Sequence, residues 1–172
     1  MDIVHSSSIV LASFLASSVE CVEALTIVLA VGVVRGWRSA LAGAGTGGTI
    51  SGAGRYLKEQ NPKVQVIATD SVNSFRATKG NPKPYKIEGI GVDFVSPVLD
   101  YAVVDAFYEV HDDDALAMLK TLAHKHGLLV GPSSGAVACA VAQYAPQLNE
   151  GDIAVMICGD SGRAYLSKNL YV

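Results

Sequence analysis

Cysteine is scarce in this chain, and no pattern brings the thiols together. Cys21, Cys139 and Cys158 are far apart and form no Cys-x-x-Cys pair. That spacing excludes a disulfide framework and a cysteine-based zinc site. The four histidines have no useful ligand spacing with carboxylates or cysteines either. We therefore predict no metal site, and we interpret the cysteines as small buried apolar residues of a cytosolic protein.

Charge is also sparse. Charged residues make up 17% of the 172 residues, the formal net charge is −3, and basic residues form no run. A nucleic-acid partner is excluded on those grounds, because such binding depends on clustered positive charge. Hydrophobic residues make up 50% of the chain, a share that excludes disorder and favours a buried core or a membrane segment.

A long apolar run lies near the N-terminus. Residues 9–34 carry only two charges, Glu20 and Glu23, and are numerous enough to cross a bilayer as a helix. We expect residues 1–43 to form an apolar helical leader that contacts or spans a membrane. A buried helix of a soluble protein is the open alternative. A secretory signal peptide fits poorly, because residues 1–8 contain no lysine or arginine.

From residue 44 to residue 172 the pattern changes to short apolar strands that alternate with helices. This alternation predicts an α/β fold with a parallel sheet flanked by helices, preceded by the N-terminal apolar helix. The expected strands are 64–69, 106–110, 128–130 and 153–158, and the expected helices are 50–60, 112–126, 136–144 and 163–170. Gly127 is expected to end the second of these helices, and Asp112–Asp114 are expected to cap its start.

The most informative motif is the glycine-rich stretch Gly43–Thr49, directly before the expected helix 50–60. Glycine permits positive φ and close backbone approach, so successive N–H groups can face one anion. The helix N-terminus adds a partial positive charge at the same place. We therefore expect a bound phosphorylated ligand at this loop. A glycine turn without a ligand is the structural alternative.

A second functional interpretation of this loop is dinucleotide binding. Gly43, Gly45 and Gly48 satisfy the G-x-G-x-x-G fingerprint, and Asp70 follows at a suitable distance for a ribose contact. The fingerprint requires a strand directly before the loop, however, and residues 36–42 form only a weak one. Dinucleotide binding therefore stays the less favoured alternative.

Two further small-residue turns follow expected strands, at Gly131–Gly135 and Gly159–Gly162. Ligands of parallel sheets bind at the carboxyl ends of the strands. We expect these two turns to converge there with Gly45–Thr49. Ser133 and Ser134 could alternatively cap the next helix, and Asp160 could cap its own.

From Gly45 onwards the chain resembles the fold type II pyridoxal phosphate enzymes, the cysteine synthase and cystathionine β-synthase group. Four motifs carry the resemblance, in the family's order. They are Gly45-Thr46-Gly47-Gly48-Thr49, Glu88-Gly89-Ile90-Gly91, Gly131-Pro132-Ser133-Ser134-Gly135 and the stretch from Asp160 to Lys168. The last motif looks more like that of cystathionine β-synthase.

The resemblance implies pyridoxal 5′-phosphate as cofactor. It implies that Gly45, Thr46, Gly47, Gly48 and Thr49 hold the phosphate, that Gly89 lies beside the cofactor, and that Ser133 faces the pyridine nitrogen. The implied reaction is β-replacement on L-serine with a thiol, in sulfur amino-acid metabolism. A cysteine synthase that uses O-acetylserine and sulfide is the open alternative.

The chain also departs from the family. The family's Schiff-base lysine lies upstream of the phosphate loop, and no lysine precedes Gly45 here. Residues 1–43 look instead like part of an unrelated bacterial membrane protein. We expect a fusion or truncation product that is inactive alone and has no catalytic residue of its own. A non-enzymatic membrane-tethered fragment is a further alternative. We expect a cytoplasmic location, with tethering through 9–34, and self-association through exposed apolar faces.

Overall fold

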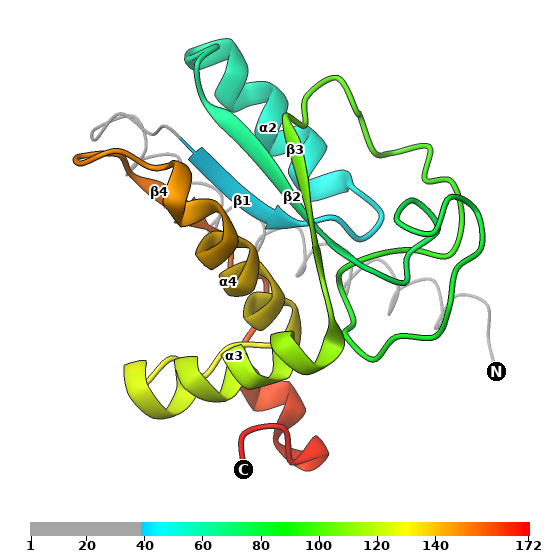
Figure 1. Ribbon diagram of the computed structural model, residues 1–172, viewed down its shortest axis with the longest axis vertical. Coiled ribbons are helices and arrows are strands. Elements are labelled where there is room, and N and C mark those ends of the chain that lie inside the picture. The colour runs from blue at the N-terminus through cyan, green and yellow to red at the C-terminus, as the bar shows by residue number, and fades with distance from the viewer. Residues whose placement is uncertain (1–38) are drawn as a thin grey trace, which may run out of the picture. The chain divides into compact units, whose positions relative to one another are not determined.

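The computed structural model describes residues 39–172 of the protein. In this part of the chain, four strands form one parallel sheet in the order β3-β2-β1-β4 (Figure 1). The strands are β1 Ser39–Gly43, β2 Gln65–Ser71, β3 Ala106–Val110 and β4 Ala154–Met156. The predicted α/β fold with a parallel sheet is confirmed. The predicted apolar helix within 9–34 lies outside the described residues.

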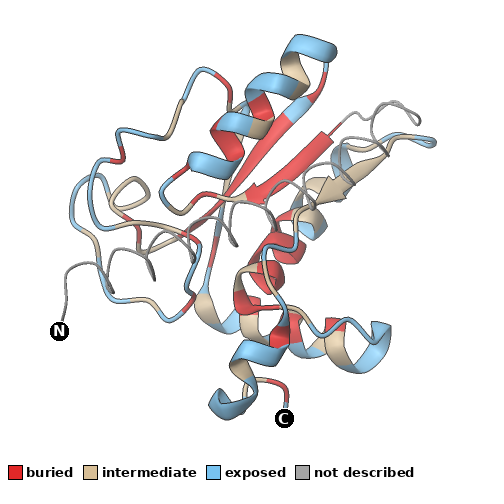
Figure 2. Ribbon diagram, turned by 180° about the vertical axis from the view of Figure 1, so that it is seen from behind, coloured by how far each residue is buried: buried red, intermediate tan, exposed pale blue. Residues whose placement is uncertain are grey.

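Helices cover both faces of the sheet. They are α2 Gly48–Gln60, α3 Asp112–His126 and α4 Pro132–Tyr144, with 3-10 helices η1 Ala145–Gln147 and η2 Gly162–Lys168. Ile67 of β2 packs with Val137 of α4, whereas the adjacent Val66 lies under Gly54 of α2. Because successive side chains of a strand point to opposite faces, α2 and α4 lie on opposite sides of the sheet. Figure 2 shows the buried residues concentrated between these layers.

A second apolar cluster joins α3 and α4 to the end of β3 and to the segment that contains the motif Glu88–Gly91. It contains Ile87, Ile90, Val110, Ala115, Ala136 and Cys139. Burial raises the pKa of the Cys139 thiol to about 11, which keeps it protonated and unreactive at neutral pH. The expected burial is thus correct for Cys139 but wrong for Cys158, which is exposed. Cys21 lies outside the described residues.

Strand β1 is stronger than its sequence indicates. Residues 36–42 were expected to form only a weak strand, yet Ser39–Gly43 pairs with β2 on one side and β4 on the other. Its small residues suit this central position, because Ser39, Leu41 and Ala42 are at most 4% exposed between two helical layers. A strand therefore does precede the glycine loop, and this objection to the dinucleotide fingerprint was wrong.

Other expectations were met or corrected locally. Strand β3 and helix α3 have their predicted bounds, and Gly127 ends α3 in the left-handed conformation with φ 67°. The expected strand 128–130 is wrong, since only Val130 makes an isolated antiparallel bridge, to Ser161. The capping role of Asp112–Asp114 is also wrong. His111 is the N-cap of α3, and no side chain makes a capping hydrogen bond there.

Candidate functional site

The glycine loop joins the carboxyl end of β1 to the start of α2. It is anchored at Ala44, whose N–H donates to the carbonyl of Thr69 at 2.7 Å and whose carbonyl accepts from the N–H of Gly91 at 3.0 Å. Beyond this anchor the chain enters the first turn of α2. The N–H groups of that turn have no carbonyl four residues earlier within the helix. They are therefore available to an anion.

Gly47 makes the sharp change of direction from loop to helix. It is the N-cap of α2 and has φ 92°, in the left-handed region that favours glycine. A Cβ atom at Gly47 would lie 2.6 Å from the Cβ of Leu99. Both the backbone angle and the neighbouring chain therefore require glycine at this position.

The glycine loop forms the wall of a cavity of about 360 Å³. Its lining includes all five residues predicted to hold a phosphate, Gly45 to Thr49, together with Gly43, Gly89, Gly91 and Val92. A volume of this size is within the range of small-molecule sites. The structure thus brings the predicted phosphate loop and the predicted Gly89 turn together around one space.

A second cavity, of about 260 Å³, adjoins the first. Both cavities are lined by Gly43, Thr49 and Gly89. The second also has Ser133, from the first turn of α4, and Asp160, which follows β4. The predicted convergence of the three small-residue turns is therefore observed. The turn that contains Ser133 was predicted to follow a strand. Instead, Ser133 is positioned by the first turn of α4.

The backbone at Gly89 lies close to both the glycine loop and Ser133 of α4, between the two cavities. Gly89 has φ 86°, and a Cβ atom there would lie 3.2 Å from the Cβ of Ser133. Its carbonyl oxygen would lie 2.9 Å from a Cβ at Gly43 and 3.2 Å from one at Gly45. A side chain at any of these glycines would push the glycine loop, the Gly89 turn and α4 apart.

The electrostatics of the site favour an anion. Helices α2 and α4 both begin at its wall, and neither has an acidic residue in its first turn. Helix α3, which begins elsewhere, has Asp112, Asp113 and Asp114 there. Acidic side chains normally stabilise a helix N-terminus. The positive end of the α2 dipole is therefore open to a ligand, whereas at α4 the Asp160 carboxylate lies against the N-cap residue Gly131.

Asp160 lines the second cavity. The sequence places it in the Gly159–Gly162 turn and the fourth motif, with capping of its own helix as the alternative, and does not single it out as a site residue. The cap of η2 is instead Ser161, whose Oγ accepts from the N–H of Arg163 at 3.3 Å. The Oδ2 atom of Asp160 accepts a hydrogen bond from the hydroxyl of Tyr165. Its Oδ1 atom is buried without a hydrogen-bond partner, as is the Oγ of Ser134. Neither Ser133 nor Ser134 makes a capping bond in α4. The sequence signal for a role of Asp160 at the site was its place directly after Gly159, at the start of the fourth motif.

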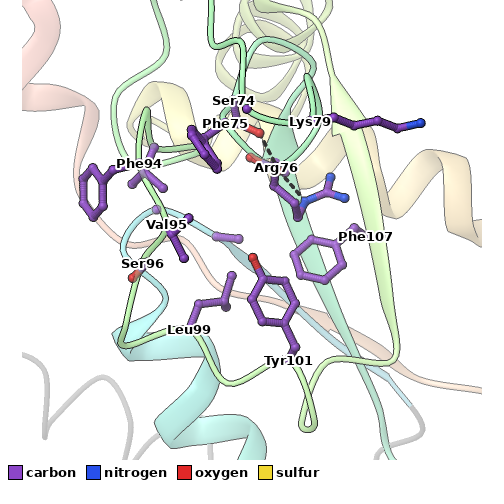
Figure 3. A pocket seen from close by; sticks show the side chains of 15 residues that line it. Ser74, Phe75, Arg76, Lys79, Phe94, Val95, Ser96, Leu99, Tyr101 and Phe107 are labelled. Atoms are coloured by element: carbon purple, nitrogen blue, oxygen red, sulfur yellow. Dashed lines mark hydrogen bonds and ion pairs between the residues drawn. The ribbon is translucent and has the colours of Figure 1, made fainter.

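A third cavity, of about 180 Å³, lies on another side of the glycine loop (Figure 3). Its charged lining residues are Asp70, Arg76 and Lys79. Arg76 Nε lies 2.7 Å from Oδ2 of Asp70, and Arg76 Nη2 lies 2.9 Å from Oε1 of Glu109. The guanidinium carbon is 4.2 Å from the centroid of the Phe107 ring. Arg76 is thus a partly buried cation that pairs with the buried Asp70 and the exposed Glu109 and stacks on Phe107.

The same ion pair bears on dinucleotide binding. Asp70 has a side chain only 4% exposed. Its Oδ1 accepts from the N–H of Ser71, and its Oδ2 accepts from Ser74 Oγ and Arg76 Nε, all within 2.8 Å. Both oxygens of the Asp70 carboxylate therefore already accept hydrogen bonds from protein groups. Asp70 is not among the residues that line the cavity of Gly45–Thr49, so the ribose contact of that alternative finds no support.

Some chemistry is missing from residues 39–172. No lysine lines either of the two adjoining cavities. No group of three histidine, cysteine or acidic side chains could hold a metal ion in this part of the chain. None of its helices is long and apolar enough to cross a membrane. The predicted membrane contact through 9–34 lies outside the described residues.

Comparison with known proteins identifies the group to which this site belongs. The sequence profile of the family described as "Pyridoxal-phosphate dependent enzyme" matches residues 24–159. The chain belongs to this family. Its match begins ahead of residue 43, and β1 itself lies in Ser39–Gly43. The division of the chain at residue 43 stays a prediction.

Individual relatives narrow the group within the family. The chain is 45% identical over 139 residues to a cystathionine beta-synthase of Saccharomyces cerevisiae, covering 76% of this chain and 27% of that protein. It is 40% identical over 134 residues to a cysteine synthase of Helicobacter pylori, covering 78% and 44%. The chain thus spans less than half of the length of these relatives.

Solved structures agree with these relatives. An O-acetylserine dependent cystathionine beta-synthase from Helicobacter pylori superposes with a TM-score of 0.74 at 39% identity, covering 80% of this chain and 45% of that one. An O-ureido-L-serine synthase gives a TM-score of 0.78 at 29% identity, covering 86% and 46%. The resemblance to fold type II pyridoxal phosphate enzymes is therefore confirmed, and the cofactor of this family is pyridoxal phosphate.

Proposed function

We propose that this chain forms the phosphate- and ring-binding part of a pyridoxal phosphate site for β-replacement on L-serine. The observation that carries the proposal is the pair of adjoining cavities, one walled by Gly45–Thr49 and the other by Ser133. The N-terminus of α2, which has no acidic residue in its first turn, favours the phosphate dianion at the first cavity. The second cavity offers a neutral hydroxyl to the pyridine nitrogen.

The residues present fit this cofactor. Backbone N–H groups of Gly45 to Gly48 and the hydroxyls of Thr46 and Thr49 would bind the phosphate oxygens. When bound, pyridoxal phosphate supplies the electron withdrawal that makes the β-substituent of an amino acid a leaving group. Ser133 is neutral and can donate to an unprotonated ring nitrogen. It therefore keeps that withdrawal moderate, which suits replacement at the β-carbon.

The lysine that would join the cofactor covalently is not among these residues. All eight lysines of the chain follow Gly45. Lys58 is paired with Asp105 at 2.8 Å, and Lys168 is paired with Glu88 at 2.8 Å. We therefore infer that the 172 residues by themselves bind the cofactor reversibly and do not turn over substrate.

The test is a titration of the purified 172-residue protein with pyridoxal 5′-phosphate, followed by borohydride reduction and peptide mapping. We expect saturable binding that inorganic phosphate competes away, and no stoichiometric label on any single lysine. Absence of saturable binding would contradict the assignment of the site. Specific labelling of one lysine would contradict the inferred inactivity while supporting the site.

A second assay separates the two candidate reactions. The relatives include both cystathionine beta-synthase and O-acetylserine dependent enzymes, so O-acetylserine with sulfide is the competing substrate pair. Each amino acid is offered to the cofactor-loaded protein, and the change in the cofactor's absorption spectrum is recorded. We expect L-serine to displace the spectrum at lower concentration than O-acetylserine. The reverse order would favour cysteine synthase chemistry.

A further inference from the structure

A segment without regular structure crosses the glycine loop on the side away from α4. We call residues 96–100 the strap. Ser96, at its start, is only 6% exposed. Its hydroxyl donates to the carbonyl oxygen of Thr46 in the middle of the glycine loop. The same Oγ atom accepts from the N–H of Val98 at 3.3 Å, which orients the hydroxyl.

The middle of the strap packs directly on the loop. Leu99 occupies the space beside Gly47, with its Cβ atom 2.6 Å from the position that a Gly47 Cβ would take. In Figure 3, Ser96 and Leu99 lie on the same short segment beside the start of α2. This contact excludes water from one side of the glycine loop and prevents the loop from moving toward the strap.

The far end of the strap is attached to α2. The N–H of Asp100 donates to Ser51 Oγ at 2.9 Å, and Asp100 Oδ2 lies 2.7 Å from Arg55 Nη2. The Arg55 side chain is 64% exposed, so this ion pair is screened by water and contributes little. The buried polar link between strap and loop is therefore the one that Ser96 makes.

Peptide geometry turns this link into a control of the anion site. The carbonyl of Thr46 and the N–H of Gly47 belong to one planar trans peptide unit, so they point in opposite directions. When Ser96 holds the carbonyl on the strap side, the N–H of Gly47 faces the other side of the loop. No residue of the strap is among those that line the cavity of Gly45–Thr49, so this cavity lies on the side of the loop away from the strap.

We propose that Ser96 is a positioning residue for phosphate binding, acting through the Thr46–Gly47 peptide. The inference rests on the proposed function. Without the hydroxyl, this peptide is free to rotate, and the Gly47 N–H no longer points steadily at the phosphate. The loss concerns only the phosphate, because Ser133 and the ring cavity are not attached to the strap.

The experiment compares Ser96→Ala, Ser96→Thr and a control, with pyridoxal 5′-phosphate and phosphate-free pyridoxal as probes. The matched control is Ser39→Ala, which removes another buried side-chain hydrogen bond, Ser39 Oγ to Tyr144 at 3.3 Å, at the opposite end of β1. We expect Ser96→Ala to weaken pyridoxal phosphate about 5- to 30-fold. Pyridoxal should change less than about twofold, and Ser96→Thr should restore binding of the phosphate ester. Ser39→Ala should leave both affinities unchanged.

Equal affinity of Ser96→Ala and wild type for the phosphate ester would overturn the proposal. So would an equal loss for both probes, since that indicates general damage. Amide hydrogen exchange of the ligand-free proteins tests the role of Ser96 independently of the proposed function. We expect faster exchange at residues 44–51 in Ser96→Ala only. If wild type binds no pyridoxal phosphate, the cofactor assignment fails, and unchanged exchange at 44–51 would then overturn the role of Ser96 as well.

Discussion

At the scale of single residues, the glycines of the candidate site matter mainly because they have no side chain. Gly45, Gly47 and Gly89 contribute backbone groups, and their missing side chains let the loop, the turn and α4 approach one another. Catalytic side chains with unusual pKa values are not what defines this site. Function at this scale is therefore most sensitive to added atoms, and glycine substitutions are the informative ones.

Replacing Gly47 with alanine should damage both stability and ligand binding. The new Cβ meets a left-handed φ of 92° and a Leu99 Cβ atom at 2.6 Å. We expect the free energy of unfolding to fall by about 2 kcal/mol or more, and the affinity for pyridoxal phosphate to fall more than about tenfold. Urea unfolding and a cofactor titration measure the two effects.

Gly151 provides the matched control for this change. It also has a positive φ, of 87°, but nothing lies within 4 Å of its hypothetical Cβ atom. Gly151→Ala should therefore cost only about 1–2 kcal/mol of backbone strain and leave cofactor affinity intact. If both variants lose stability and affinity equally, the contact with Leu99 has no role.

Tyr165 gives the site a pH dependence that can be measured. Its hydrogen bond to Asp160, with burial and nearby negative charges, raises the pKa of this phenol from 10.0 to about 12. The contribution to stability is present in full below the unfolded pKa and is lost as pH rises from about 10 through 12. We expect Tyr165→Phe to lose its stability deficit relative to wild type over this interval. A pH series of urea unfolding, with ultraviolet titration of the phenols, tests this. A deficit that is constant with pH would contradict it.

At the scale of elements, helix N-termini and helix contacts place the functional groups. Helix α4 carries Ser133 into the second cavity because it packs on the sheet through Val137 and on α3 through Gly135. Helix α2 begins where the glycine loop ends. The two helices lie on opposite faces of the sheet, so the N-terminus of α2 lies at the first cavity and that of α4 at the second.

Gly135→Ala tests the α3–α4 contact. Helix propensity alone would stabilise α4 by about 1 kcal/mol. The added Cβ, however, would lie 2.4 Å from the carbonyl oxygen of Ala115, a backbone atom that cannot rotate away. We expect a net loss of about 1–3 kcal/mol, measured by urea unfolding. Gly52→Ala on α2, where nothing lies within 4 Å, should instead be neutral or stabilising.

At the scale of the whole molecule, residues 39–172 expose apolar side chains on the strap and directly next to it in the sequence. Phe94, Val95, Val98 and Tyr101 are between 48% and 67% exposed. Adjacent apolar residues with this much exposure are typical of surfaces that contact another molecule.

Self-association through this surface is the corresponding prediction. We expect the apparent mass in size-exclusion chromatography to rise with protein concentration. Val95→Ser with Val98→Ser should reduce that rise, because the double variant removes exposed apolar area without touching the core. The exposed Leu166, 54% exposed on η2, serves as control in Leu166→Ser. A protein that stays monomeric at high concentration would contradict the prediction.

Much of the fold followed from local patterns. Strand β3 and helix α3 have strong periodicity and clear end signals, such as Gly127, and were predicted with their bounds. Strand β1 has a weak sequence signal because four of its five residues, all but Leu41, are small. Its stability comes from β2 and β4, which are distant in sequence. The apolar character of residues 128–130 favours a strand, yet Leu128 and Leu129 are 49% and 44% exposed and form none.

Some features of the candidate site are likewise evident from the sequence, and others are decided only by the tertiary structure. Glycine content and motif order are properties of the sequence alone and indicate the family and the cofactor, and the sequence alone also shows that no lysine precedes Gly45. The contact of Ser96 with Thr46, the unpartnered oxygen of Asp160 and the commitment of Asp70 to Arg76 required the folded chain. Each joins groups that no periodicity relates, because their proximity arises only when separate strands and helices pack around one sheet.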